Sequence, residues 1–280
     1  MLEKAKKLYH FSTTWTGTFV VVLLAIFFLA QAFVIPSGSM KRTYLIGDFL
    51  LVKKYAYGIP IPHIPMLEIP LMPDLFDNGH LIEGPHPKRG DVTVFRYPHN
   101  PKIHYVKRCV AVGGDKLMLR NKDLYIRPHE GDEYIKNNYL PGLIAIISGE
   151  LWVKNPYFYE HPKAQHDDAI TREEHAMYSP ELFDFGPILI EENKFFMMGD
   201  NREHSGDSRS WGSVPYKNIV GTPWITYLSW ESRSYDEVTR GGEHNSPDAQ
   251  DVGLVCKELN PLSSECEQKW EQNRYKIRWE

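Results

Sequence analysis

The sequence predicts a mainly β fold: an antiparallel β-sheet domain that carries an inserted, smaller β-rich domain and is preceded by one N-terminal transmembrane helix. Three observations support this prediction. One long apolar run lies near the N-terminus. Short segments rich in β-branched and aromatic residues recur after it, as is typical of strands. A polar, irregular stretch over 116–190 separates two groups of these segments.

The composition excludes some classes of protein. The chain has 280 residues, of which 42% are hydrophobic and 24% charged, as in a globular protein of one large or two smaller domains. The formal net charge of −4 argues against nucleic acid as a partner, because binding phosphates requires a concentrated basic surface. Lys4, Lys6 and Lys7 make the chain basic just before the apolar run.

The apolar run predicts a membrane anchor. No Asp, Glu, Lys or Arg occurs between Lys7 and Lys41, and residues 15–35 are long enough to cross a bilayer as one helix at ~1.5 Å per residue. The preceding lysines place residues 1–14 in the cytoplasm, so we expect a single-pass protein of the inner (cytoplasmic) membrane with a periplasmic or extracytoplasmic catalytic domain. A removable signal peptide ending at Ala30-Gln31-Ala32 is the alternative, but the apolar run continues beyond it.

The rest of the chain divides into strand-like segments. The main domain is expected over 36–115 and 191–280, with the second domain inserted at 116–190. Residues 59–87 are dense in proline and glycine, which predicts a β-ribbon or loop insertion. The tail is expected to be loop-like over 232–260 and a helix or strand over 270–280. Strands are expected at 49–52, 91–97, 103–112, 123–127, 151–154, 187–190, 195–198, 218–221 and 224–230.

Two segments carry candidate chemistry. In the turn Pro36-Ser37-Gly38-Ser39, proline fixes one φ angle and glycine frees another, so Ser39 can be held at a bend. A serine nucleophile needs a base to take its proton. Lys107 lies in an apolar strand, where burial would lower its pKa far enough for it to serve; a surface lysine on a strand edge is the alternative. Alternation places Lys107 on one face with Tyr105 and Cys109.

Five sequence blocks resemble, in the same order, those of the bacterial type I signal peptidases. The first runs from Phe33 to Met40 and continues with Leu45–Val52. The others are Lys88–Pro98, Tyr105–Arg108, Gly113–Asp115 and Gly199–Arg209. The resemblance covers roughly 33–57, 87–116 and 195–225.

This resemblance implies a membrane-bound serine endopeptidase with a Ser-Lys dyad. Ser39 would be the nucleophile that forms an acyl-enzyme, and Lys107 the general base. The Ser39 N–H and the Ser37 hydroxyl would form the oxyanion hole, and Ser205 would orient the lysine. The implied partners are preproteins, cut after small-x-small sites such as Ala-x-Ala, and membrane lipid. We expect no cofactor and no metal ion.

Further residues are assigned by matching positions. Those expected to support the site's geometry are Asp200, Arg202, Asp207 and Arg209. Those expected to wall a shallow substrate pocket are Phe33, Ile35, Pro36, Met40, Tyr44, Leu50, Tyr105 and Val106. The chain departs from the family pattern at Arg42-Thr43-Tyr44, where Pro-Thr-Leu is usual, and this leaves the shape of the pocket open.

Several alternatives remain at this level. Cys109 is either a buried thiol or a nucleophile, and His204 with Ser205 and Asp207 suggests a Ser-His-Asp triad. The remaining candidates are a Cys256–Cys266 disulfide, a metal site among His161, His166, Asp167, Asp168 and His175, and core or membrane-interface roles for Trp224, Trp230 and Trp279.

Two other functions compete with signal-peptide removal. A self-cleaving Ser-Lys regulator would carry a DNA-binding region where this chain has its apolar run. An inactive membrane-tethered binding protein of the same fold would not need Ser39, Lys107 and Ser205, yet all three are present.

Overall fold

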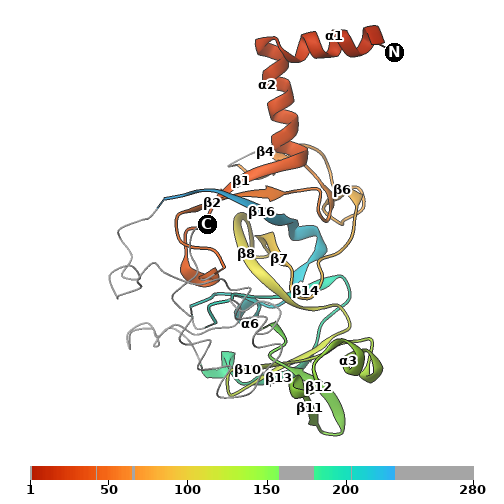
Figure 1. Cartoon of the computed structure of the whole chain (residues 1–280), viewed down its shortest axis with the longest axis vertical. Helices are drawn as coiled ribbons and strands as arrows, with labels where there is room; N and C mark the ends of the chain where they lie inside the picture. The colour runs from red at the N-terminus through yellow and green to blue at the C-terminus, as the bar shows by residue number, and fades with distance from the viewer. Residues whose placement is uncertain (1, 42, 65–66, 158–179, 203, 231–280) are drawn as a thin grey trace.

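The computed structural model describes residues 2–41, 43–64, 67–157, 180–202 and 204–230 (Figure 1). Several predictions therefore lie outside the described residues: those for Arg42, for the tail with Trp279 and the two cysteines, and for the histidine-containing group at 161–175.

The N-terminal segment is helical over only part of the predicted anchor. Helices α1 (Leu2–Ser12) and α2 (Trp15–Leu24) are followed by a π-helical turn, η1 (Ala25–Leu29), and then by strand β1 (Ala30–Val34). In Figure 1, α2 projects from the sheets and α1 turns away from it at a steep angle. None of the described helices is both long and apolar enough to span a bilayer.

The prediction of one helix over 15–35 is thus wrong in its last third. Residues 30–34 pair instead with β2 (Asp48–Lys53), from Ala30 opposite Lys53 to Val34 opposite Phe49. Local sequence does not decide between the two, because a short apolar run suits either a helix or a strand. The joint between η1 and β1 is pinned by Lys54, whose backbone N–H donates to Leu29 O (3.0 Å) and whose Nζ donates to Ile26 O (3.3 Å).

The larger sheet has seven strands in the order β1-β2-β16-β7-β8-β14-β15. Its remaining strands are β7 (Val92–Tyr97), β8 (Asn100–Val112), β14 (Lys194–Met198), β15 (Val214–Pro215) and β16 (Ile219–Ser229). All of its pairings are antiparallel, so the prediction of a mainly antiparallel β fold is confirmed. The two strands predicted at 218–221 and 224–230 form one continuous strand, β16. The strand can contain Pro223 because its pairing with β2 is irregular at that point.

A second sheet of five antiparallel strands, in the order β11-β12-β10-β9-β13, lies within 116–190. Its strands are β9 (Lys116–Arg120), β10 (Asp123–Arg127), β11 (Ile144–Ile147), β12 (Glu150–Lys154) and β13 (Phe185–Leu189). Helix α3 (Asp132–Asn138) and the 3₁₀ turns η3 (Pro141–Leu143) and η4 (Pro180–Leu182) connect or flank them. One hydrophobic core joins Val110 and Phe196 of the first sheet to Leu117 and Ile126 of the second.

The proline-rich segment at 59–87 contains two small strand pairs. Strand β3 (Gly58–Pro60) pairs with β6 (His80–Glu83), and β4 (His63–Ile64) with β5 (Ile69–Pro70). The Tyr216 ring lies between the rings of His80 and His86, at centroid distances of 4.4 and 4.2 Å, and its hydroxyl donates to the carbonyl of Tyr57. These contacts fix the segment to the larger sheet.

The two faces of β8 contribute to different cores. On one face, Val106 packs against a cluster containing Ile35, Leu50 and Val94. On the other, Tyr105 and Cys109 belong with a cluster containing Phe95 and Met197. The alternation expected for this strand is present, and it places Lys107 on the Tyr105 side.

Candidate active site

Ser39 and Lys107, 68 residues apart in sequence, are in direct contact. Ser39 lies in a 3₁₀ turn, η2 (Gly38–Met40), and Lys107 lies in the middle of β8. The Nζ atom of Lys107 donates to Ser39 Oγ at 2.5 Å. Both side chains are buried, with exposed fractions of 6% for Ser39 and 2% for Lys107. The arrangement supplies a serine hydroxyl and a basic nitrogen at hydrogen-bonding distance.

Burial changes the acid-base properties of the lysine. Desolvation lowers the pKa of Lys107 from its ordinary value of 10.5 to about 8, against the opposing influence of the Asp207 and Asp200 carboxylates. A substantial fraction of the side chain is therefore neutral near pH 8. Only the neutral amine can accept the serine proton.

The turn that holds Ser39 is tied to the loop after β14. The Ser39 carbonyl accepts from the backbone N–H of Asn201 (3.1 Å), and Asn201 Nδ2 donates to Gly38 O (3.3 Å). Ser37 is exposed, and its Oγ lies 3.4 Å from Ser39 Oγ. The predicted oxyanion donor thus stands beside the candidate nucleophile.

Asp207 and Arg209 brace this loop from within. Arg209 Nε donates to Asp207 Oδ1 at 2.8 Å, and the other carboxylate oxygen accepts from Gly199 N at 2.9 Å. Burial by itself acts to raise the pKa of the Asp207 carboxyl, but Arg209 and these hydrogen bonds bring the pKa below its usual value. Arg202 adds two further contacts to this loop. Its Nε donates to Gly199 O, and its carbonyl accepts from Arg209 Nη2.

Asp200 anchors a second set of contacts that sequence reasoning did not find. Arg108 Nε and Nη2 each lie 2.8 Å from an Asp200 carboxylate oxygen, and Thr43 Oγ1 donates to Asp200 at 2.5 Å. A buried arginine requires such a partner, so an arginine directly after Lys107 in an apolar strand was a usable signal.

Ser205 and His204 are placed differently from each other. Ser205 is buried beside Asp207, and within the described residues no hydrogen bond joins its hydroxyl to Lys107, so the lysine-orienting role stays a prediction. The Asp207 carboxylate is engaged by Gly199 and Arg209. This arrangement disfavours a triad with His204.

Cys109 has the features of a structural thiol. The side chain is fully buried, and burial raises the pKa of the Cys109 thiol well above its ordinary value. A nucleophilic cysteine requires the opposite shift.

The structure divides the predicted substrate wall into separate groups. Phe33, Tyr44 and Val106 are partly buried and pack against the cluster that contains Ile35 and Leu50. Burial raises the pKa of Tyr44 to about 12. Met40 is buried and Pro36 is exposed. Tyr105 lies on the opposite side of β8, with the other core.

Two aromatic residues that sequence reasoning missed lie next to Tyr105. Trp211, at the end of α6 (Ser208–Trp211), has its ring 6.3 Å from that of Tyr105 with an interplanar angle of 12°. Tyr97 is 5.3 Å from Tyr105 and 5.5 Å from Trp211. Trp211 follows the Gly199–Arg209 block by two residues, and nothing local indicates that it meets β8.

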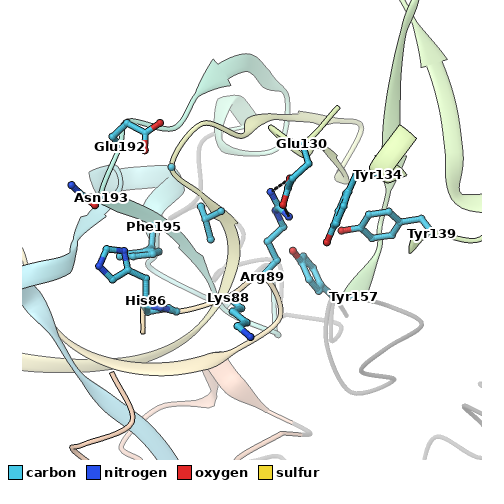
Figure 2. A pocket seen from close by; sticks show the side chains of 13 residues that line it. His86, Lys88, Arg89, Glu130, Tyr134, Tyr139, Tyr157, Glu192, Asn193 and Phe195 are labelled. Atoms are coloured by element: carbon cyan, nitrogen blue, oxygen red, sulfur yellow. Dashed lines mark hydrogen bonds and ion pairs between the residues drawn. The ribbon is translucent and has the colours of Figure 1, made fainter. Parts of the chain in front are cut away.

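A cavity of about 540 Å³ lies apart from this dyad, where the two sheets meet. Figure 2 shows Tyr134, Tyr139 and Tyr157 on one side of it and His86 with Phe195 on the other. Its lining is His86, Pro87, Lys88, Arg89, Val112, Gly113, Glu130, Tyr134, Tyr139, Tyr157, Glu192, Asn193 and Phe195.

Arg89 and Glu130, which line this cavity, belong to a cluster of charged and polar groups. Ligand atoms of Asp115, His129 and Glu130 lie within 4.8 Å of one another. Arg89 bridges the two carboxylates, with Nη2 2.5 Å from Asp115 and 2.7 Å from Glu130. The guanidinium compensates their charge, so the geometry gives no reason to place a cation there.

Sequence comparisons with known proteins agree on one family. The sequence model described as "Signal peptidase, peptidase S26" matches residues 8–228. A signal peptidase I of Helicobacter pylori is 47% identical over 242 residues, which cover 80% of this chain and 83% of the relative. One from Pseudomonas aeruginosa is 34% identical over 244 residues, covering 82% and 77%. A solved signal peptidase I of Enterococcus faecalis is 20% identical, covers 49% of this chain and 97% of that chain, and has a TM-score of 0.31.

Proposed function

The chain belongs to the signal peptidase I family of S26 serine endopeptidases, and on that premise we propose that it removes N-terminal signal peptides from exported preproteins by way of an acyl-enzyme on Ser39. The observation that carries this proposal is the 2.5 Å contact between a buried lysine and a buried serine.

The first half of the reaction uses both members of the dyad. Neutral Lys107 takes the proton from Ser39 Oγ as that oxygen attacks the scissile carbonyl carbon. The carbonyl oxygen becomes an oxyanion, which the Ser39 N–H and the Ser37 hydroxyl stabilise. The C–N bond then breaks, and Lys107 delivers its proton to the leaving amine, which is the new N-terminus of the mature protein.

The second half returns the enzyme to its starting state. Water attacks the ester carbonyl while Lys107 again takes a proton. The C–O bond to Ser39 breaks, the proton returns to Ser39 Oγ, and the signal peptide leaves with a free carboxyl group. In this scheme Ser205 orients Lys107 when substrate is bound. The contacts that keep the site in shape are those of Asp200, Arg202, Asp207 and Arg209.

In this proposal the preprotein binds at the edge of the larger sheet. Strand β1 is the end strand of that sheet, and Ser39 follows it by five residues. An extended peptide can therefore pair along β1 and bring its scissile bond to Ser39. Phe33, Tyr44 and Val106 are partly buried and pack against one hydrophobic cluster. A pocket walled by these large side chains would admit only small ones, which favours cleavage after Ala-x-Ala.

The same proposal places the enzyme at the inner membrane, with residues 1–14 in the cytoplasm and the sheets in the periplasm. Three lysines precede the apolar helix, and its Phe19, Val21 and Leu24 are exposed. Trp224 and Tyr227 of β16 are exposed as well, at 53% and 54%. Indole and phenol rings are favoured at the lipid interface, which supports membrane lipid as a partner.

Cleavage of a purified Ala-x-Ala preprotein tests the proposal. We expect the full-length protein in detergent to cut once, after the second alanine, and Ser39→Ala and Lys107→Ala to be inactive. Cys109→Ala serves as the control and should retain activity. An inert wild type would favour the binding-protein alternative, and cleavage of its own chain alone would favour the self-cleaving regulator.

A further inference from the structure

Three aromatic rings form a continuous surface next to the dyad, which we call the aromatic wall: Tyr97, Tyr105 and Trp211. They come from β7, β8 and α6, and each is only partly buried. Phe95 is fully buried and contacts two of them, with its ring 6.2 Å from Tyr105 and 5.9 Å from Trp211. The wall therefore has a packed base and an outer surface that solvent reaches.

The wall begins at the general base. Lys107 Nζ lies 5.3 Å from the centroid of the Tyr105 ring, and the two residues share a face of β8. In the proposed reaction this nitrogen delivers a proton to the leaving amine, so that amine must come within hydrogen-bonding distance of it. The first residues of the mature protein then pass next to Tyr105, with Trp211 and Tyr97 as the continuation of the surface.

The other side of the scissile bond has its own binding elements. In the proposed mode of recognition, the signal-peptide side pairs with β1 and faces Phe33 and Val106. Val106 and Tyr105 belong to different clusters on opposite faces of β8. The two faces of one strand thus serve the two sides of the bond that is cut.

We propose that Trp211 and Tyr97 determine specificity for the first residue of the mature protein and favour an apolar or aromatic side chain there. Aromatic rings offer large apolar faces, and offset or edge contacts with another ring add to the gain from burial. A lysine at the same place would approach the ammonium of Lys107, and an aspartate would gain no apolar contact.

The position of Trp211 is coupled to the catalytic loop. Helix α6 begins after Asp207, whose side chain accepts from the backbone N–H of Arg209. The same carboxylate holds Gly199. The wall is therefore fixed to the loop that carries Ser205, and its rings keep their place relative to Lys107.

The inference rests on the proposed function and is tested with matched preproteins. These share one signal peptide ending in Ala-x-Ala and differ only in the first mature residue: Phe, Leu, Ala, Asp or Lys. The variants are Trp211→Ala, Trp211→Phe and Tyr97→Ala, in the full-length protein. The control is Tyr134→Ala, which alters a partly buried tyrosine of α3 in the cavity away from the dyad.

We expect wild type to prefer Phe or Leu over Asp in kcat/KM by about tenfold. Trp211→Ala and Tyr97→Ala should reduce that ratio several-fold while the alanine substrate is little affected. Trp211→Phe should keep most of the ratio, and Tyr134→Ala should keep all of it.

Four outcomes would overturn the inference. Equal rates of wild type on every substrate would remove the preference itself. A ratio unchanged in Trp211→Ala and Trp211→Phe would remove the role of the wall, and an equal loss on all substrates would leave Trp211 a structural residue. A wild type that cuts no preprotein contradicts the proposed function as well, which separates the two failures.

Discussion

Arg108 and Asp200 form a doubly hydrogen-bonded ion pair in the protein interior, with Nε and Nη2 of the arginine each 2.8 Å from a carboxylate oxygen. Their side chains are 4% and 0% exposed. The pair joins β8 directly after Lys107 to the loop that holds the Ser39 carbonyl. It therefore connects the two chain segments that meet in the dyad.

Breaking this pair should destabilise the protein. Removing one partner leaves a buried charge without compensation, which costs about 3–5 kcal/mol. We expect Asp200→Asn to lower the free energy of unfolding by an amount in that range, measured by denaturant titration. The control is Asp132→Asn, which breaks the ion pair between Asp132 and Arg127. The Asp132 side chain is 46% exposed, so this substitution should lower the free energy of unfolding by about 1 kcal/mol or less. Equal stability of the two variants would contradict this account.

The pH dependence of cleavage should report Lys107. Burial lowers the pKa of Lys107 to about 8. If Lys107 is the general base, as proposed, the enzyme is inactive below that pH, where the amine is protonated, and becomes active as the pH rises through it. We expect kcat/KM to rise about tenfold per pH unit between pH 6 and 7 and to level off above pH 8. A profile measured with a short peptide substrate checks this, and a midpoint near 10 would show that Lys107 is solvated in the working enzyme.

Tyr44 should restrict the substrate pocket. Its partly buried ring packs, as Phe33 and Val106 do, against the cluster that contains Ile35 and Leu50. We expect Tyr44→Leu to improve cleavage of substrates with valine or leucine in place of the first alanine by about tenfold relative to Ala-x-Ala. Tyr125→Leu, a partly buried tyrosine of β10, is the control. If the two variants have the same selectivity as wild type, Tyr44 is not part of the pocket.

Gly199 should not tolerate even a methyl group. An added Cβ would lie 2.2 Å from Ser205 Oγ and 2.6 Å from the Ser39 carbonyl oxygen. Because the second contact is with backbone, relief requires the Ser39 turn to move. We expect Gly199→Ala to reduce kcat/KM by about 100-fold, as a misplacement of about 1 Å can do.

The same loop supplies the matched control for Gly199. A Cβ on Gly206 would meet nothing within 4 Å. Gly206→Ala should therefore cleave at close to the wild-type rate. Equal losses in the two glycine variants would point to loop flexibility rather than to the crowding around Ser39.

Local patterns predicted much of the sheet. The β-branched and aromatic runs of β7 and β8 were visible, and so was the alternation that separates Tyr105 from Val106. The contact between Ser39 and Lys107 could be predicted only from the resemblance to signal peptidases, because no local sequence pattern links residues 68 positions apart.

The errors share a physical cause, which is that strand partners lie far away in sequence. Residues 30–34 become a strand because β2 is available beside them. Pro223 stays within β16 because an irregularity in the pairing with β2 accommodates it. Trp211 gains its neighbours from β7 and β8, which its own short helix does not reveal.

Turn η1 passes directly into β1, and Lys54 holds this joint, so the apolar helix and the larger sheet are rigidly connected. No flexible linker separates the apolar helix from the strand that leads to Ser39. The five residues of β1 span about 16 Å at ~3.3 Å per residue, and Ser39 follows five residues after the end of this strand. In the proposed membrane-bound enzyme, a tilt of the apolar helix would therefore move Ser39 relative to the membrane surface, and the depth at which a signal peptide presents its bond would become a selection criterion independent of its side chains.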